Sequence, residues 1–118
     1  MKNIYLNIYE PNLVNFKKAK KNLENNNVIG LPTETVYGLA ANAYSDKSVK
    51  KIFKLKKRPP FNPLIIHFKN LKGLKKDVIC NDSFIKLYKA FCPGPITFVL
   101  NKNPKSKISK MAIAGKKT

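Results

Sequence analysis

The sequence predicts a mixed α/β domain, and three features of its 118 residues support that prediction. Short apolar runs of strand length alternate with longer runs in which apolar residues recur at helical spacing. Their order is strand, helix, strand, loop and helix, which is typical of a mixed sheet covered by helices. The hydrophobic fraction of 43% is large enough for a packed core, and a chain of this length forms one domain, residues 1–118.

The expected elements follow from periodicity and from residues that begin or end helices. Each long helix carries apolar residues on one side and mostly lysines on the other, so its apolar side should face the core. Asp82 is expected to cap the last helix, and Pro93-Gly94-Pro95 to end it. The predicted helices cover residues 12–25, 46–56 and 82–91, with one helical turn within 69–79, and the predicted strands cover residues 3–9, 28–31, 64–68 and 96–100.

The formal net charge of +18 predicts contact with a polyanion, either nucleic acid or nucleotide phosphates. Arg58 is the only arginine among the 24 basic residues. Lysines spread over every helix are equally consistent with a solvated surface produced by a compositional bias. Phosphate binding requires clustered charge, so the composition leaves both interpretations open.

Other features of the composition bear on cellular location. No apolar run approaches the roughly 20 residues of a membrane span. The first residues lack the apolar core and the cleavage site of a signal peptide. Cys80 and Cys92 have no metal-ligand spacing, which predicts reduced thiols. We therefore expect a cytoplasmic protein without membrane contact.

Polar side chains follow the predicted strand 28–31 in the run from Leu31 to Leu39. Pro32 should end the strand, and two hydroxyls, a carboxylate and a phenol follow within five residues. Groups beyond the carboxyl end of a strand lie where open α/β sheets bind ligands, and Gly38 would permit a close backbone approach. The alternative is a turn in which Thr33 or Thr35 caps a short helix.

The run from Lys56 to Pro63 combines three cations with three prolines. Cations at a helix end, followed by proline, are common for structural reasons alone. The functional alternative is a phosphate clamp, because the planar fork of Arg58 suits phosphate oxygens and the prolines would stiffen the loop.

His67, the sole histidine, lies within a predicted strand. A structural role is the simpler interpretation, and a hydrogen bond to a substrate is the alternative. No second histidine or carboxylate stands at metal-ligand spacing, so no metal site is predicted. The sequence also contains no arrangement of a side-chain nucleophile with a base that we could assemble.

These stretches together resemble the YrdC-like family, the L-threonylcarbamoyladenylate synthases. The resemblance rests on four ordered motifs that span most of the chain. They are Pro32-Thr33-Glu34-Thr35-Val36-Tyr37-Gly38-Leu39, Lys56-x-Arg58-Pro59, Pro63-Leu64 ahead of His67, and Pro93-Gly94-Pro95-Ile96-Thr97.

The resemblance implies synthesis of threonylcarbamoyl-AMP from L-threonine, bicarbonate and ATP, with release of pyrophosphate. ATP would be a substrate accompanied by Mg²⁺, and no protein-bound cofactor is implied. Partner proteins would pass the threonylcarbamoyl group to tRNA. By motif position, the resemblance implies ATP contacts at Lys56, Arg58, Asn62 and Thr118 and threonine contacts at Thr35 and His67.

The resemblance also implies a YrdC-like twisted mixed open sheet with flanking helices. Family members continue with an arginine-containing strand and a Ser-Ala-Asn motif, so this chain corresponds to their N-terminal portion and its sheet is expected to be incomplete at the C-terminus. Two alternatives remain. One is a basic module that binds tRNA or rRNA without catalysis. The other is a domain of a larger carbamoyltransferase, which would require acylphosphatase-like and zinc-finger sequence upstream, and neither precedes Met1 here.

Overall fold

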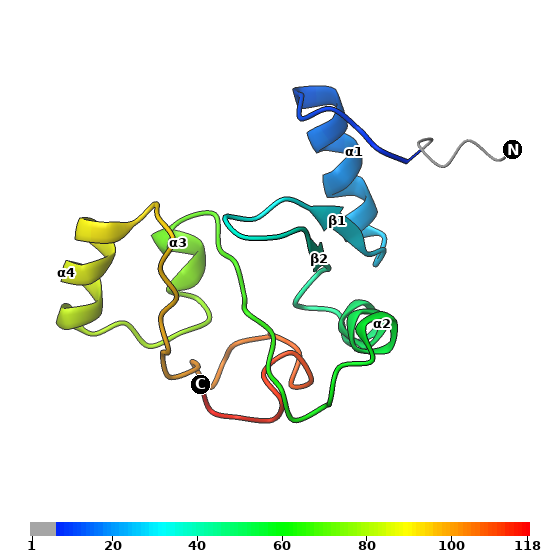
Figure 1. Ribbon diagram of the computed structural model, residues 1–118. Coiled ribbons are helices and arrows are strands. Elements are labelled where there is room, and N and C mark those ends of the chain that lie inside the picture. Colours follow the sequence, from blue (N-terminus) through cyan, green and yellow to red (C-terminus); the bar gives the residue numbers. More distant parts are fainter. Residues whose placement is uncertain (1–6) are drawn as a thin grey trace, which may run out of the picture.

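The computed structural model describes residues 7–118, which form four helices and a small two-stranded sheet (Figure 1). The mixed α/β class is therefore confirmed. The predicted strand 3–9 lies mostly outside the described residues, and residues 7–9 belong to no strand. The helices are α1 (Leu13–Glu24), α2 (Asp46–Lys56), α3 (Leu71–Leu74) and α4 (Asp82–Phe91), and the strands are β1 (Ile29–Leu31) and β2 (Gly38–Ala40).

Each long helix begins at a side chain that caps it. Asn12 accepts a hydrogen bond from the Asn15 amide at 3.0 Å, and Ser45 accepts one from the Ser48 amide at 3.3 Å. The predicted bounds of the three long helices are confirmed to within a residue. The expected cap of α4 was wrong by one position, because Asn81 accepts from the Phe84 amide at 2.8 Å and Asp82 is the first helical residue.

Strand β1 pairs with β2 in an antiparallel hairpin, with Ile29 opposite Ala40 and Leu31 opposite Gly38. The sequence predicted β1 and missed β2, because a three-residue strand centred on one leucine has no visible periodicity. The short helix of the alternative interpretation was wrong, since the chain turns back into β2, but its capped turn is confirmed, because Thr33 accepts from the amides of Thr35 and Val36.

The predicted strands 64–68 and 96–100 are not paired into a ladder within the described part of the chain. Their side chains nevertheless alternate as in strands. Leu64, Ile66 and Phe68 are partly buried while Ile65 is 65% exposed, and Phe98 and Leu100 are partly buried while Val99 is 81% exposed. The sequence pattern was read correctly, but it cannot show whether a neighbouring strand is present to complete the ladder.

The last part of the chain supplies much of the core. Val49 of α2 packs in one cluster with Ile108, Ala112 and Ile113, all nearly inaccessible to solvent. The sequence suggested only a basic, polar stretch after residue 101. The lysines at positions 107, 110 and 116 concealed the burial of Ile108, Ala112 and Ile113. Leu64, Ile66, Phe68 and Phe53 pack against this cluster, so the extended segment 64–68 is anchored by its inward side chains.

The carboxylate of Asp77 joins segments that are far apart in sequence. It is 3% exposed, and it accepts hydrogen bonds from the Tyr44 hydroxyl at 2.5 Å and the Ser106 hydroxyl at 2.6 Å. Partial burial and the nearby Asp77 carboxylate together raise the pKa of Tyr44 from 10.0 to about 12. The neutral phenol is therefore the form that the fold stabilises.

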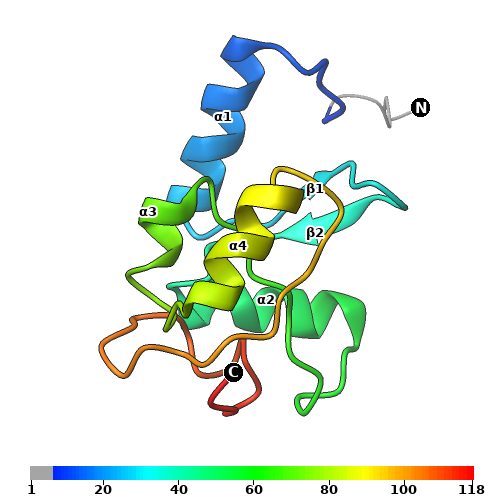
Figure 2. The ribbon, with the colours of Figure 1, turned by 90° about the vertical axis from the view of Figure 1, so that its left-hand side faces the viewer.

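Much of the apolar surface is uncovered. Helix α1 stands away from the other helices (Figure 1), and only its lower end approaches α3 in the view of Figure 2. The expected burial of its apolar face was wrong, because Leu13 is 79% and Phe16 57% exposed. The accessible surface is 9918 Å², whereas a compact monomer of this mass, 13.4 kDa, exposes about 6,500 Å². None of the described helices is both long and apolar enough to cross a membrane.

We predict that Tyr44→Phe lowers the free energy of unfolding by about 1–2 kcal/mol at neutral pH, because a hydrogen bond to a buried carboxylate is lost. The folded-state pKa of Tyr44 lies above its unfolded value, so this contribution is complete below pH 10 and disappears as the pH approaches about 12. Urea unfolding of both proteins at pH 7, 9 and 11 measures it.

Tyr9→Phe is the matched control, because Tyr9 is 55% and Tyr44 54% exposed and the Tyr9 hydroxyl bonds to none of the described residues. A Tyr44→Phe protein as stable as the Tyr9→Phe control at pH 7 would contradict the role given to Asp77.

Candidate functional site

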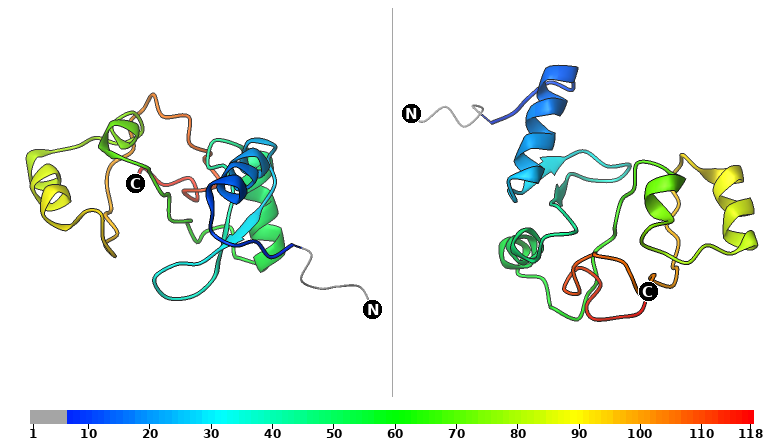
Figure 3. Two further views of the ribbon diagram at one scale, coloured as in Figure 1. Left: turned by 90° about the horizontal axis from the view of Figure 1, so that it is seen from above. Right: turned by 180° about the vertical axis from the view of Figure 1, so that it is seen from behind.

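The predicted site residues lie on three segments that the fold holds in different ways. Thr35 lies in the β1–β2 loop, Lys56 and Arg58 lie at the end of α2, and His67 lies in the extended segment 64–68. The β1–β2 loop projects from the body of the molecule in the views of Figures 2 and 3. Any ligand that touches all three segments must therefore lie on the side from which this loop extends.

The β1–β2 loop is organised by one side chain. The Thr33 hydroxyl oxygen accepts hydrogen bonds from the amides of Val36 at 3.1 Å and Thr35 at 3.3 Å, and the hydroxyl donates to the Val36 carbonyl. These bonds fix the backbone on either side of Thr35. The side chain of Thr35 is exposed, so its hydroxyl is presented to solvent from a defined turn.

No described neighbour requires glycine at position 38. A Cβ atom at Gly38 would lie 3.4 Å from the Thr33 methyl group, an ordinary van der Waals contact. Gly94 is the glycine that the backbone requires, because a Cβ there would lie 2.4 Å from the Phe91 carbonyl oxygen. The turn that follows α4 therefore depends on Gly94.

Arg58 holds the proline-rich loop in place. Its Nε atom donates to the Asn62 carbonyl at 3.1 Å, and one terminal nitrogen donates to the Pro63 carbonyl at 2.7 Å. The residue before it, Lys57, adopts a left-handed conformation with φ of 49° and ends α2. Two of the five N–H donors of Arg58 are thus used within the loop, and three remain for a ligand.

A first cavity of about 600 Å³ lies between α2 and the turn at residues 110–115. Phe53, Pro60 and Met111 form its apolar part. The lining surface is almost entirely apolar, so the four cationic residues around it contribute mainly their aliphatic stems. These residues are Lys50, Lys54, Arg58 and Lys110. Only Arg58 among them was predicted from the sequence, and only the spacing of four between Lys50 and Lys54 on α2 could have indicated a shared helix face.

A second cavity of about 620 Å³ lies between the extended segments 64–68 and 96–100. His67 and Thr118 both line it, so the structure brings these two predicted residues to one cavity although 51 positions separate them. Neither of the two cavities is lined by Thr35, Lys56 or Asn62. The predicted ATP residues are therefore divided, with Arg58 at the first cavity and Thr118 at the second.

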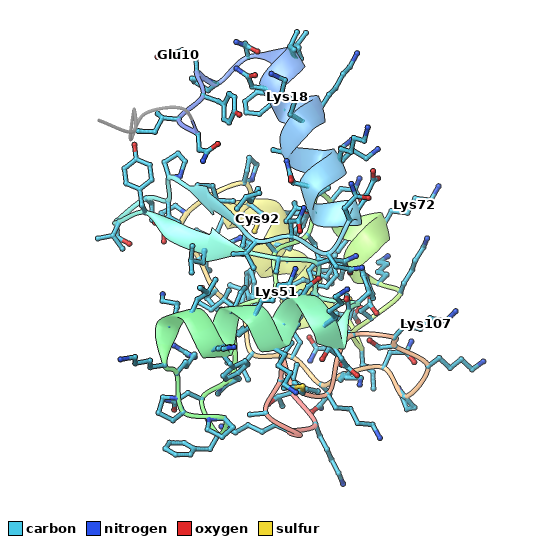
Figure 4. The ribbon with its side chains drawn as sticks, turned by 90° about the vertical axis from the view of Figure 1, so that its right-hand side faces the viewer. Glu10, Lys18, Lys51, Lys72, Cys92 and Lys107 are labelled. Atoms are coloured by element: carbon cyan, nitrogen blue, oxygen red, sulfur yellow. The ribbon has the colours of Figure 1, made fainter. Side chains whose placement is uncertain are left out.

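Several lysines of the described residues lie apart from one another. Figure 4 shows Lys18, Lys72 and Lys107 pointing outward from three separate segments. Lys51 donates to the Asn26 carbonyl at 2.8 Å, and Lys18 also lies 5.1 Å from the Tyr9 ring centre. These positions are consistent with the solvated-surface interpretation.

The thiols and carboxylates add no further site within residues 7–118. Cys80 and Cys92 are both free and half-buried. The described histidine, cysteine, aspartate and glutamate side chains form no group of three that could hold a metal ion.

Comparison with known proteins places these features in a family. The family profile Sua5_yciO_yrdC, described as "Telomere recombination", matches residues 21–118. A threonylcarbamoyl-AMP synthase of Pyrococcus abyssi is 46% identical over 91 residues, which are 75% of this chain and 25% of the relative. A putative threonylcarbamoyl-AMP synthase of Methanocaldococcus jannaschii is 35% identical over 108 residues, which are 88% of this chain and 52% of the relative.

The fold agrees with the sequence match. The crystal structure of Pyrococcus abyssi Sua5 complexed with L-threonine superposes with a TM-score of 0.84 and 34% identity, covering 92% of this chain and 32% of that one. The chain belongs to the Sua5/YciO/YrdC family, which confirms the resemblance found in its motifs. It spans between a quarter and about half of the length of these relatives.

We predict that Arg58→Ala releases the loop 59–63 and lowers the free energy of unfolding by about 1–2 kcal/mol, because two carbonyls lose a charged donor. Arg58→Lys should recover only part of this loss, since an ammonium group cannot reproduce the fork. Hydrogen exchange at the Asn62 and Leu64 amides, with urea unfolding, measures both effects. The control is Lys56→Ala, which removes a neighbouring exposed cation, and equal exchange in all three variants would contradict the anchoring role.

Proposed function

We propose that this chain forms the threonine-binding and nucleotide-binding portion of a threonylcarbamoyl-AMP synthase. The observation that carries the proposal is the superposition on Pyrococcus abyssi Sua5 complexed with L-threonine, at a TM-score of 0.84 over 92% of this chain. Relatives that share its motifs are named threonylcarbamoyl-AMP synthases. This similarity favours an enzyme over a module that binds RNA without catalysis.

The proposed reaction needs positioning and charge neutralisation more than side-chain chemistry. The threonine amine attacks the carbon of bicarbonate, water leaves and a carbamate forms, and one carbamate oxygen then attacks the α-phosphate of ATP. The bond from the α-phosphate to the bridging oxygen breaks, pyrophosphate leaves, and threonylcarbamoyl-AMP remains. Negative charge on the phosphate oxygens is stabilised by fixed cations and N–H donors, so no protein nucleophile is required.

We assign the nucleotide end of the site to Lys56, Arg58, Asn62 and Thr118. The anchored loop supports this assignment, because Arg58 is held by the carbonyls of Asn62 and Pro63 and keeps three N–H donors for phosphate oxygens. Mg²⁺ would enter with ATP, since this ion usually binds through substrate phosphates and keeps several waters. The described carboxylates would then serve no direct ligand role.

We assign the threonine end to Thr35 and His67. Thr35 is exposed on a turn whose backbone Thr33 fixes, and His67 is exposed on the outward side of the segment 64–68. A hydroxyl and an imidazole can hydrogen-bond the hydroxyl and carboxylate of threonine. Bicarbonate would be the third substrate, and partner proteins would transfer the product's threonylcarbamoyl group to tRNA.

The test uses this chain joined to the part of the Methanocaldococcus jannaschii relative that it does not cover. We predict that Thr35→Ala and His67→Ala each raise the threonine concentration for half-maximal pyrophosphate release about tenfold. A lost hydrogen bond to a substrate accounts for this magnitude. ATP affinity, measured separately, should change less than twofold.

Thr35→Ser, which keeps the hydroxyl, is the matched control and should retain threonine use. Two results would reject the assignment. One is a loss of ATP affinity with unchanged threonine dependence. The other is a Thr35→Ser protein as impaired as Thr35→Ala.

A further inference from the structure

The first cavity, between α2 and the turn at residues 110–115, combines an apolar surface with basic surroundings. Phe53, Pro60 and Met111 supply most of the apolar surface, and none of the residues that line the cavity is acidic. Phe53 also packs against the core cluster, so the fold holds this surface in place. The volume of about 600 Å³ is within the range of protein ligand pockets, so the cavity can receive apolar side chains.

Three lysines place their charges around this apolar surface. Lys50, Lys54 and Lys110 all line the first cavity, and all three are exposed. Because their aliphatic stems contribute to the lining, their ammonium groups lie at its solvent edge. None of the three forms an ion pair with a carboxylate of the described residues. Their charges are therefore free to meet an anionic partner.

The walls of the first cavity are fixed by hydrogen bonds within the chain. The turn is closed by the Gly115 amide, which donates to the Lys110 carbonyl at 2.8 Å. The Ser109 hydroxyl, just before the turn, donates to the carboxylate of Asp46 in the first turn of α2. Walls that are already ordered reduce the entropic cost of binding, so the first cavity is suited to bind a ligand without rearrangement.

We propose that the first cavity is a docking site for an acidic segment of a partner protein, in which one or two apolar side chains are flanked by aspartates or glutamates. The apolar side chains would pack against Phe53 and Met111. The flanking carboxylates would face the ammonium groups of Lys50, Lys54 and Lys110. The flexible thioether of Met111 would adapt to apolar groups of different shape.

Charge complementarity favours this occupant over a second copy of the chain. The chain carries a net charge of +18 and only six acidic residues, so two copies repel one another. Asp77 is buried, and the carboxylates of Asp46 and Glu24 are paired with Ser109 and Lys20. A nucleic-acid backbone would meet the lysine charges, but its phosphates would leave the apolar surface between them uncovered.

Peptide docking at the first cavity is independent of the proposed enzymatic function. Lys50, Lys54 and Met111 belong to neither the nucleotide end nor the threonine end of the assigned site. Arg58 lines the cavity, but two of its N–H donors bond to carbonyls of the proline-rich loop. Docking is measured without substrates or turnover, so its failure and the failure of the proposed function give different results.

The experiment follows the fluorescence anisotropy of a labelled peptide, Glu-Asp-Glu-Phe-Glu-Glu-Leu-Asp-Glu. It is titrated with this chain, and with the chain joined to the part of the Methanocaldococcus jannaschii relative that it does not cover. One control peptide has serine in place of phenylalanine and leucine, and the other has glutamine and asparagine in place of the acidic residues. The first peptide should bind both proteins equally, and at least tenfold more tightly than either control peptide. Binding no tighter than that of a control peptide, or binding lost in the joined protein, would overturn the proposal.

Substitutions test the location. Lys50→Glu, Lys54→Glu and Met111→Gln should each weaken binding of the peptide about fivefold. The controls Lys86→Glu and Leu87→Gln lie on α4, line neither cavity and should change the affinity less than twofold. Lys86 is exposed like the two lysines, and Leu87 is 46% exposed compared with 40% for Met111. Equal weakening by the controls would contradict docking at the first cavity.

Competition at constant ionic strength separates the peptide from other ligands. Neither ATP nor a uridine oligonucleotide should displace the labelled peptide, whereas the unlabelled peptide should displace it completely. Displacement by ATP would assign the first cavity to the nucleotide end of the site. Displacement by the oligonucleotide as strong as that by the unlabelled peptide would make it a nucleic-acid site, and either result would refute peptide docking.

Discussion

The buried carboxylate of Asp77 is the interaction on which the arrangement of the chain depends. Asp77 is 3% exposed, and its carboxylate accepts from the hydroxyls of Tyr44 and Ser106, while its backbone carbonyl accepts from the Asn103 amide. Asp77, which follows α3, is thereby joined to the residue just before the cap of α2 and to residues 103–106. A buried charge needs several donors to offset its lost hydration, so none of these partners can be removed without cost.

Two loops that carry predicted site residues are held by local hydrogen bonds and not by regular structure. Thr33 fixes the β1–β2 loop, and Arg58 fixes the proline-rich loop. The Thr35 hydroxyl lies 3.4 Å from the Thr33 hydroxyl, and the exposed Thr35 side chain keeps further hydrogen-bonding capacity for a ligand. Arg58 both anchors its loop and keeps N–H donors for a ligand, and the fork of a guanidinium group suits these two roles better than the ammonium group of a lysine.

The three long helices were predictable from local sequence. Residues such as Asn12 and Ser45 favour helix N-caps, and the spacing of apolar residues indicates the apolar face of each helix. The motif residues from Pro32 to Leu39 led to the family. The pairing state of 64–68 and 96–100 was not predictable, because alternation reports a strand's two faces and says nothing about its lateral neighbours. The burial of Ile108 and Ile113 was missed because nearby lysines lower the mean hydropathy of this segment. The cationic residues around the first cavity could not be grouped from the sequence, because only the tertiary fold brings them together.

The contact between the last segment and α2 has a consequence for synthesis of the chain. Ser109 bonds to Asp46, 63 positions earlier, and Ala112 and Ile113 pack against Val49. Helices α1 and α2, of 12 and 11 residues, are too short to be stable without packing, and the core has no closing side until residues 108–113 have left the ribosome. The apolar face of α2 therefore stays uncovered during most of the synthesis of the chain. Folding is slowed by this long-range contact, and a chaperone can bind the uncovered face until the contact forms.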